Sequence, residues 1–186
     1  MYPRYREMGN SKYWNPEDKA PMIYVGGVCK NEGKSDAKAG WGIKYGSTQY
    51  ETGSDGGSVP GAQTAHRGQL SAVNAALERA AANPFYDKVS IVSNDVKLGR
   101  EVFGKRAPGN DDLWASIDAN RARVDASFET MLEDDDSQYF RGPLNRAKEA
   151  AGVISQRAPS GKGPKGSTWR TSDRARAESD DEYDNC

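Results

Sequence analysis

The chain has 186 residues, which is enough for one domain of ordinary size with tails but not comfortably for two. Its 26 Lys and Arg residues nearly balance its 27 Asp and Glu residues, so the net charge is -1. This balance excludes a global positive field of the kind that indicates a nucleic-acid-binding protein. Any nucleic-acid partner must therefore be bound by a local patch.

Cysteine usage and hydropathy favour an intracellular, soluble protein. Cys29 lies in an apolar run and Cys186 is the last residue, which argues against a structural disulfide between them and for a reducing compartment. The N-terminal residues lack the apolar stretch of a signal peptide. No segment approaches the roughly 20 apolar residues that span a bilayer, so we expect no membrane partner.

The first half of the chain is predicted to form antiparallel strands after an irregular N-terminal arm, residues 1–20. Residues 22–28 are a short β-rich run that ends at paired glycines, and residues 39–46 alternate apolar and polar positions. Residues 48–52 can add a third strand. Residues 53–61 contain enough Gly, Ser and Pro to break any regular element.

The second half is predicted to alternate helices and strands. Apolar residues recur at spacings of three and four over residues 64–82, which predicts a helix, and residues 89–93 are a buried-strand candidate. This strand–helix–strand order favours a mixed α/β sheet. We expect a second helix to begin at Asp111, a last strand over 127–132 and an Ala-rich helix over 144–155.

These elements predict one domain over residues 21–157 and a disordered tail over residues 158–186. The tail contains almost no apolar residues and is basic first and acidic last. Lys162, Lys165 and Arg170 are candidates for RNA binding by counterion release. A purely solubilising tail is the alternative.

Four segments resemble type 1 ribonucleases H in the same order. Ile23-Tyr-Val-Gly-Gly-Val-Cys resembles the family's first strand, and Pro60-Gly-Ala-Gln-Thr-Ala-His-Arg-Gly-Gln-Leu resembles the segment that leads into its first helix. Ile91-Val-Ser-Asn-Asp resembles a strand end of the family, and Gly109-Asn-Asp-Asp-Leu-Trp resembles a helix start. The resemblance covers about residues 22–155 and implies an α/β, ribonuclease H-like mixed sheet with three antiparallel strands, then parallel strands, and flanking helices.

The family's four metal-binding carboxylates are missing from the matching positions. These carboxylates hold two divalent ions, Mg²⁺ or Mn²⁺, which align the attacking water and stabilise the phosphodiester displacement. The resemblance places Gly26, Gln69 and Asn94 at three of the positions. Our preferred alignment places Asn145 at the fourth, and a shift by one places Leu144 there. We therefore expect no metal cofactor and no catalysis.

A metal site rebuilt from other acids is the alternative. Asp95, Asp36, Glu32 and the run over residues 133–136 are the candidate ligands. Such a site would make the protein an active metal-dependent ribonuclease H that cleaves RNA in RNA/DNA hybrids. His66, the only histidine, stands where the family has Gln, and we interpret it as a surface or helix-start residue.

The resemblance also implies a pocket for a DNA-strand phosphate. Its Thr and Asn are present as Thr64 and Asn110, although both residue types are also common helix N-caps. Lys30 and Arg100 are further candidates for phosphate binding. An Asn with which the family reads 2′-hydroxyl groups is replaced by Glu32, whose charge opposes phosphate binding.

Together these observations predict a catalytically inactive ribonuclease H-like domain that acts as a binding module. The neutral net charge and the loss of 2′-hydroxyl readers favour a protein partner or self-assembly. The surviving Thr and Asn of the phosphate pocket favour the backbone of RNA or of an RNA/DNA hybrid. The protein-interaction and RNA-binding roles are both kept as hypotheses.

Overall fold

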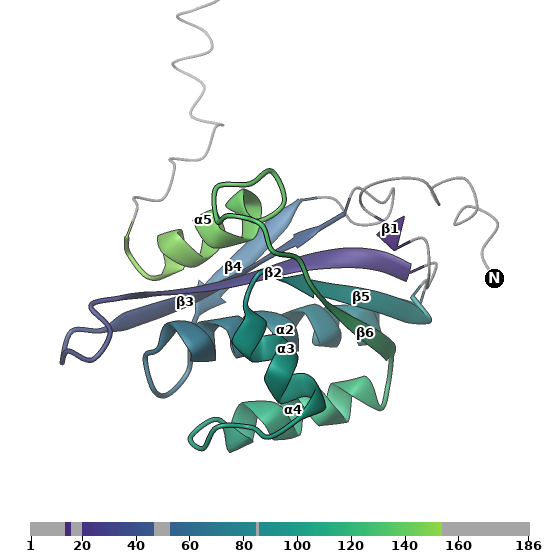
Figure 1. The fold of residues 1–186 in the computed structure, drawn as a ribbon, viewed down its shortest axis with the longest axis horizontal. Helices are drawn as coiled ribbons and strands as arrows, with labels where there is room; N and C mark the ends of the chain where they lie inside the picture. Colours follow the sequence, from purple (N-terminus) through teal and green to yellow (C-terminus); the bar gives the residue numbers. More distant parts are fainter. Residues whose placement is uncertain (1–13, 16–19, 47–52, 85, 154–186) are drawn as a thin grey trace, which may run out of the picture. The chain divides into compact units, whose positions relative to one another are not determined.

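A computed structural model describes residues 14–15, 20–46, 53–84 and 86–153 (Figure 1). The predicted tail, with Lys162, Lys165 and Arg170, and the predicted strand over 48–52 lie outside these residues. The elements in chain order are β1 Trp14–Asn15, β2 Ala20–Lys30, β3 Lys38–Tyr45, β4 Ser54–Ser58, α2 Ala65–Ala82, β5 Lys88–Ser93, α3 Val96–Phe103, α4 Asp111–Arg121, β6 Asp125–Thr130 and α5 Arg141–Ala150. In the described part of the chain, none of the helices has the length and apolar character needed to cross a membrane.

The strands form one mixed sheet in the order β4-β3-β2-β5-β6, and β1 pairs with β2. The pairs β2–β3 and β3–β4 are antiparallel, whereas β2–β5 and β5–β6 are parallel. The parallel pairs follow from the crossovers through helices, which return the chain to the same end of the sheet. The expected α/β sheet with antiparallel and then parallel strands is confirmed.

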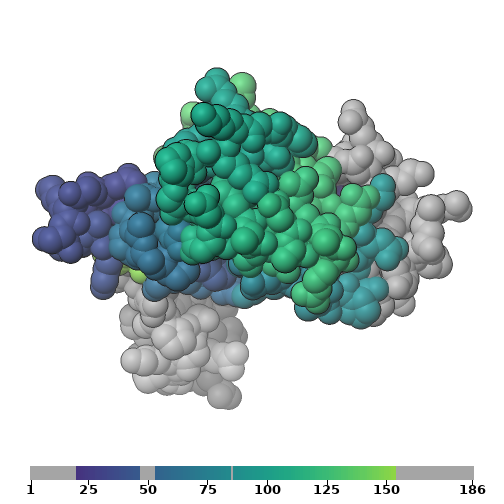
Figure 2. Space-filling view, turned by 90° about the horizontal axis from the view of Figure 1, so that it is seen from below, coloured from purple at the N-terminus to yellow at the C-terminus, as the bar shows by residue number. Residues whose placement is uncertain are grey.

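Helices cover both faces of this sheet. In Figure 1, α2, α3 and α4 lie below the sheet and α5 lies above β2, β3 and β4. Figure 2 shows the lower face, where the teal and green segment that contains α3 and α4 is in front. Because side chains alternate along a strand, β2 directs Ile23 and Val25 toward α2 and directs Met22 and Tyr24 toward α5.

Glycines allow the helices to approach the sheet at backbone distance. A Cβ atom on Gly27 would overlap the backbone of Gly68 and Gln69 in α2. A Cβ atom on Gly42 would overlap the carbonyl of Pro143 in α5. These positions explain why β2 and β3 contain so many glycines, since any side chain there would separate the layers.

The glycine-rich segment over 53–61, which we expected to be irregular, contains strand β4. Gly56 pairs with Gly42, and Gly57 pairs with Trp41. A Cβ atom on Gly56 would lie 2.8 Å from the Cβ atom of Arg146 in α5. The expectation was wrong because local strand propensity disfavours glycine, whereas the packing of α5 on this edge requires it.

Other parts of the structure also differ from the expectations. Asp111 does begin a helix, but it is not the second one, because α3 intervenes after β5. The last strand and the last helix begin at Asp125 and Arg141, earlier than expected. Two residues of the arm that we expected to be irregular, Trp14 and Asn15, pair with Pro21 and Ala20 of β2.

Candidate functional site

The positions that correspond to the family's carboxylates converge where β2 and β5 run side by side. The two strands are parallel with Tyr24 beside Val92, so Gly26 of β2 lies beside Asn94, which directly follows the end of β5. Helix α2 places Gln69 next to them, because the backbone of Gln69 packs on Gly27. The start of α5 approaches the same place from the opposite face.

An apolar contact occupies the centre of this region. A Cβ atom on Gly26 would lie 2.9 Å from Cδ2 and 3.1 Å from Cγ of Leu144. Leu144 is 5% exposed and belongs to a buried cluster with Tyr24, Val92 and Phe140. Asn145, which our preferred alignment placed at the fourth position, is exposed. The residue that faces Gly26 is therefore Leu144.

Gln69 is buried and forms a hydrogen bond with a serine at the end of β5. Its Nε2 donates to Oγ of Ser93 at 2.5 Å, and the two side chains are 4% and 3% exposed. The same Oγ accepts the backbone N–H of Asp95 at 2.9 Å. A neutral amide suits this position, because a carboxylate at Gln69 would be a desolvated negative charge.

The side chain of Asn94 forms hydrogen bonds with the acidic loop, residues 133–136. Its Nδ2 donates to Oδ1 of Asp135 at 2.7 Å and to the carbonyl of Glu133 at 3.3 Å. An Asp at this position would place a second carboxylate against Asp135. The amide therefore serves as the donor that attaches the loop to the end of β5.

The acids considered for a rebuilt site bind other groups. Asp95 caps α3 by accepting the N–H of Lys97 at 2.9 Å, and Asp36 accepts from Nδ2 of Asn31 at 2.7 Å. Among the residues that the structure describes, no group of three or more His, Cys, Asp or Glu residues is arranged to hold a metal ion.

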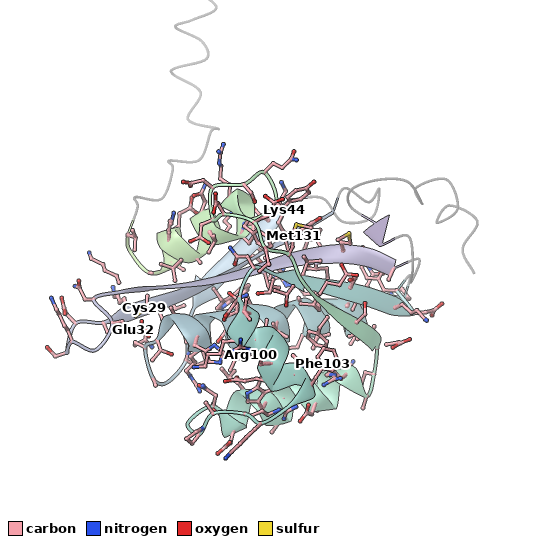
Figure 3. The ribbon with its side chains drawn as sticks, in the orientation of Figure 1. Cys29, Glu32, Lys44, Arg100, Phe103 and Met131 are labelled. Carbon is pink, nitrogen blue, oxygen red and sulfur yellow. The ribbon has the colours of Figure 1, made fainter. Side chains whose placement is uncertain are left out.

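The loop between β2 and β3 brings Glu32 to the N-terminus of α2. Oε1 of Glu32 accepts the N–H of Ala65 at 3.0 Å, where the helix dipole favours a negative charge. Nearby, the Cys29 thiol donates to the carbonyl of Gln63 at 3.3 Å. Burial and the Glu32 carboxylate raise the pKa of Cys29, which disfavours its thiolate form. Figure 3 labels both residues near the end of β2.

No protein-family model matches the sequence, and no curated protein matches it. Solved structures do match. Ribonuclease H1 of the halophilic archaeon Halobacterium salinarum is 19% identical, with a TM-score of 0.50 over 72% of this chain and 98% of that chain. LC11-RNase H1 in complex with an RNA/DNA hybrid is 18% identical, with a TM-score of 0.54 over 69% of this chain and 97% of that chain.

A third structure is LC9-RNase H1, a type 1 RNase H with the type 2 active-site motif. It is 18% identical, with a TM-score of 0.55 over 74% of this chain and 75% of that chain. The present chain has a ribonuclease H-like fold. The likeness extends over the domain that carries the sheet and its helices, so the resemblance expected from the sequence is confirmed for the fold.

The residues at the family's metal positions in this ribonuclease H fold do not fit two divalent ions. Such ions require anionic oxygen ligands. The region offers a backbone without a side chain at Gly26, a hydrocarbon at Leu144 and amides at Gln69 and Asn94. The Gln69 amide and the Asn94 amide direct their N–H groups at Ser93 and Asp135, an orientation that suits anions or hydroxyls and not cations.

The two residues for which the resemblance implied a phosphate pocket bind other groups of the chain. Oγ1 of Thr64 accepts the N–H of Arg67, so Thr64 is the N-cap of α2. Asn110 is the N-cap residue of α4, but its side chain makes no capping hydrogen bond. Its Oδ1 instead accepts from Nη1 of Arg67 at 3.3 Å. Arg67 is 4% exposed and also binds both carboxylate oxygens of Asp112, whose pKa it lowers to about 2.

The remaining phosphate-binding candidates are separate from that network. Arg100 is exposed on α3 (Figure 3), and Lys30 is exposed at the end of β2. Nζ of Lys30 donates to the carbonyl of Gly152 at 3.5 Å. The ribonuclease H fold thus retains the residues Thr64 and Asn110, but their side chains are engaged by Arg67.

A charged cluster around His66 was missed by the sequence analysis. Nε2 of His66 lies 2.8 Å from Oε2 of Glu101, and Nδ1 lies 3.5 Å from Oδ2 of Asp95. Asp95 and then Glu101 raise the pKa of His66 against the opposing effect of burial. Glu101 is 3% exposed, so the contact between the two side chains is shielded from solvent and joins α2 to α3. The cluster requires α3, which local sequence patterns did not reveal.

Proposed function

We propose that this ribonuclease H-like domain is catalytically inactive and serves as a protein-binding module. The observation that carries the proposal is the packing of Leu144 against Gly26, where the family's chemistry requires metal ligands. A leucine at 5% exposure excludes the hydrated cations that would otherwise occupy this position. The hydrogen bonds of Gln69 and Asn94 support the same proposal, because each amide has a structural partner.

The surface near the N-terminus of α2 supports a protein partner over a nucleic acid. Glu32 occupies an N–H group of this helix end that would otherwise bind an anion. Thr64 and Asn110 are engaged by Arg67, which is itself neutralised by Asp112. A phosphate backbone would have to displace these contacts and approach the Glu32 carboxylate.

Binding of an RNA/DNA hybrid is the second candidate function. It is favoured by the likeness to LC11-RNase H1, which was solved in complex with such a hybrid. Lys30 and Arg100 are exposed cations that can contact a backbone without metal ions. We expect such binding to be weak, independent of sequence and steeply reduced by salt.

A cleavage assay on a labelled RNA/DNA hybrid with Mg²⁺ or Mn²⁺ tests the inactivity. The wild-type protein should leave the hybrid intact. The informative variant restores four carboxylates through Gly26→Asp, Gln69→Glu, Asn94→Asp and Leu144→Asp. Its matched control carries Gly26→Asn and Leu144→Asn and keeps both native amides, so that the variants differ in charge more than in size. Gain of metal-dependent cleavage in the first variant alone would support the proposal.

Chelator-sensitive cleavage by the wild-type protein would contradict the proposal. Loss of that cleavage in an Asp95→Asn variant would then identify a rebuilt site at the end of β5. Hybrid binding is measured in the same samples by fluorescence anisotropy at increasing salt. Salt-sensitive binding without cleavage would favour the second candidate function over protein binding.

A further inference from the structure

A histidine lies between two carboxylates where the start of α2 meets α3. We call His66, Asp95 and Glu101 the His66 cluster. The side chain of His66 is 13% exposed, and its Nε2 lies 2.8 Å from Oε2 of Glu101, whose side chain is 4% exposed. Nδ1 is shielded from solvent and lies 3.5 Å from Oδ2 of Asp95. Both ring nitrogens therefore face a carboxylate.

These contacts are complete only when the imidazole is protonated. The protonated ring has an N–H group on each nitrogen, whereas the neutral ring has one N–H group and one lone pair. A neutral His66 donates to one carboxylate only, and its lone pair faces the other. Asp95 and then Glu101 raise the pKa of His66 against the opposing effect of burial. The contact between α2 and α3 thus favours the charged ring.

Two further charged groups near the cluster do not supply an equivalent contact. Lys97 lowers the pKa of His66 and so acts against the charged ring. Arg106 follows α3, but its guanidinium is engaged by Asp118 of α4, which is the main cause of its raised pKa. Loss of the proton from His66 therefore leaves Glu101 as a buried carboxylate without its cationic partner, which destabilises the contact.

Helix α3 depends on few buried side chains for its attachment to the domain. It has eight residues, of which only Leu98, Glu101 and Val102 are buried. Glu101 also accepts the N–H of Ala107 at 3.5 Å, which is a long hydrogen bond. A helix of this length is not stable in water without contacts to the rest of the protein. Its attachment therefore depends on two apolar side chains and on the charge of His66.

We propose that the His66 cluster is a pH-sensitive switch that holds α3 against α2 while His66 is protonated and releases α3 when His66 loses its proton. Release is a local opening of α3, with the sheet and α2 still folded. Histidine suits this role because its charge changes near neutral pH, where other side chains do not ordinarily titrate. The inference goes beyond the proposed function and does not depend on it.

The direction of the pH dependence follows from the raised pKa. In the open state His66 has its ordinary pKa of 6.5, and in the closed state its pKa is higher. The contact is therefore fully present below about pH 6.5 and is lost as the pH rises through the raised pKa. Between these two values one proton is released on opening, so the opening constant should rise by about tenfold per pH unit. In acid, His66 lowers the pKa of Asp95, so the contact persists until the pH falls through that lowered pKa.

Opening of α3 changes the surface beside the candidate site. Leu98 and Val102, which are buried in the closed state, become accessible to a partner. Asp95 directly follows Asn94, so the opening also loosens the attachment of the acidic loop to the end of β5. The pH thereby controls the exposure of both segments.

A titration of the ring signals of His66 in NMR spectra is the first test, because His66 is the only histidine of the chain. For the full wild-type chain we expect a pKa above 6.5. Glu101→Gln should lower this pKa. Glu78→Gln is the matched control, because Glu78 is exposed on the same helix about three turns away, and it should leave the pKa of His66 unchanged. A wild-type pKa at or below 6.5, or equal shifts in the two variants, would overturn the proposal.

Amide hydrogen exchange of the full chain from about pH 6 to about pH 9 measures the opening itself. After correction for the base-catalysed exchange of free amides, the opening constant of α3 should rise by about tenfold per pH unit above about pH 6.5. The amides of residues 70–77 in α2 are the internal reference and should show no such rise.

His66→Gln keeps a donor for Glu101 but does not titrate, so the opening of α3 should become independent of pH in this variant. Circular dichroism establishes that the variant is folded. Wild-type exchange in α3 that only parallels the reference amides, or a pH-dependent rise that persists in His66→Gln, would overturn the proposal.

Discussion

Two adjacent glycines of β2 face opposite sides of the sheet and have different roles. Gly27 faces α2, where a Cβ atom would overlap the helix backbone, so glycine is required by the fold itself. Gly26 faces α5, where a Cβ atom would lie 2.9 Å from Cδ2 and 3.1 Å from Cγ of the Leu144 side chain, with the Leu144 backbone farther away at 3.5 Å. The comparison teaches that a backbone neighbour requires glycine on one side of the sheet, whereas on the other side an apolar side chain faces the position at which the resemblance expected a metal ligand.

Alanine substitutions of these two glycines test that comparison. Of the predictions made here, they should give the largest difference in the free energy of unfolding. Gly27→Ala should destabilise the protein by about 4 kcal/mol or more, or prevent folding, because two backbones must separate. Gly26→Ala should cost about 1 kcal/mol, since Leu144 can move aside. Chemical denaturation measures both. Equal effects at the two positions would refute the distinction between a rigid and a flexible neighbour.

Leu144 and Asn145 provide the next largest contrast. Leu144→Ala should cost about 3 kcal/mol, because it leaves a cavity next to Gly26 and within the cluster that contains Tyr24 and Phe140. Asn145→Ala should change the free energy of unfolding by less than about 0.5 kcal/mol, because Asn145 is exposed. Thermal unfolding of the two variants makes the comparison. A costly Asn145→Ala would mean that the α5 register is different from the one described.

Restoring one of the family's carboxylates alone should destabilise the folded protein. Gln69→Glu places a carboxylate at a position that is 4% exposed and costs about 2 kcal/mol at neutral pH. Burial raises the pKa of such a carboxylate, so the cost should shrink as the pH falls through that raised pKa. Unfolding at several pH values checks this, with Gln69→Met as an uncharged control. A stabilising Gln69→Glu that depends on added Mg²⁺ would contradict the loss of the metal site.

The His66 cluster should produce the last of these contrasts, a stability that falls as the pH rises. The pKa of His66 is raised above its ordinary value of 6.5 by Asp95 and Glu101. The stabilisation is therefore fully present below about pH 6.5 and is lost as the pH rises through the raised pKa. His66→Gln keeps a donor for Glu101 but does not titrate. Subtracting its unfolding profile from that of the wild type should isolate this loss, and parallel profiles would exclude it.

Local patterns were sufficient to predict the helix of residues 65–82 and the strands around it, because apolar periodicity and turn residues are local signals. They were not sufficient for β4, whose Gly56 and Gly57 have low strand propensity and are placed by the packing of α5. Helix α3 was missed because it is only eight residues long and contains Gly99.

The residue types at the candidate site could be predicted from the sequence, whereas the contacts between its residues could not. The absence of carboxylates at Gly26, Gln69 and Asn94 could be read from the aligned motifs. The choice of Leu144 over Asn145 required the three-dimensional position of α5, since the two alternatives differ by one residue of register. The pairing of His66 with Glu101 spans 35 residues and has no sequence signal.

A titration of the wild-type protein with Mn²⁺, followed by the backbone amide signals in NMR spectra, tests the central claim most directly. The paramagnetic ion broadens the signals of residues near its binding site. We predict that any broadening begins at the exposed acidic loop, residues 133–136, and leaves Gly26 and Gln69 sharp until the loop signals have disappeared. Selective broadening of Gly26 and Gln69 at lower Mn²⁺ concentrations would contradict the claim that an apolar contact stands in the place of the metal site.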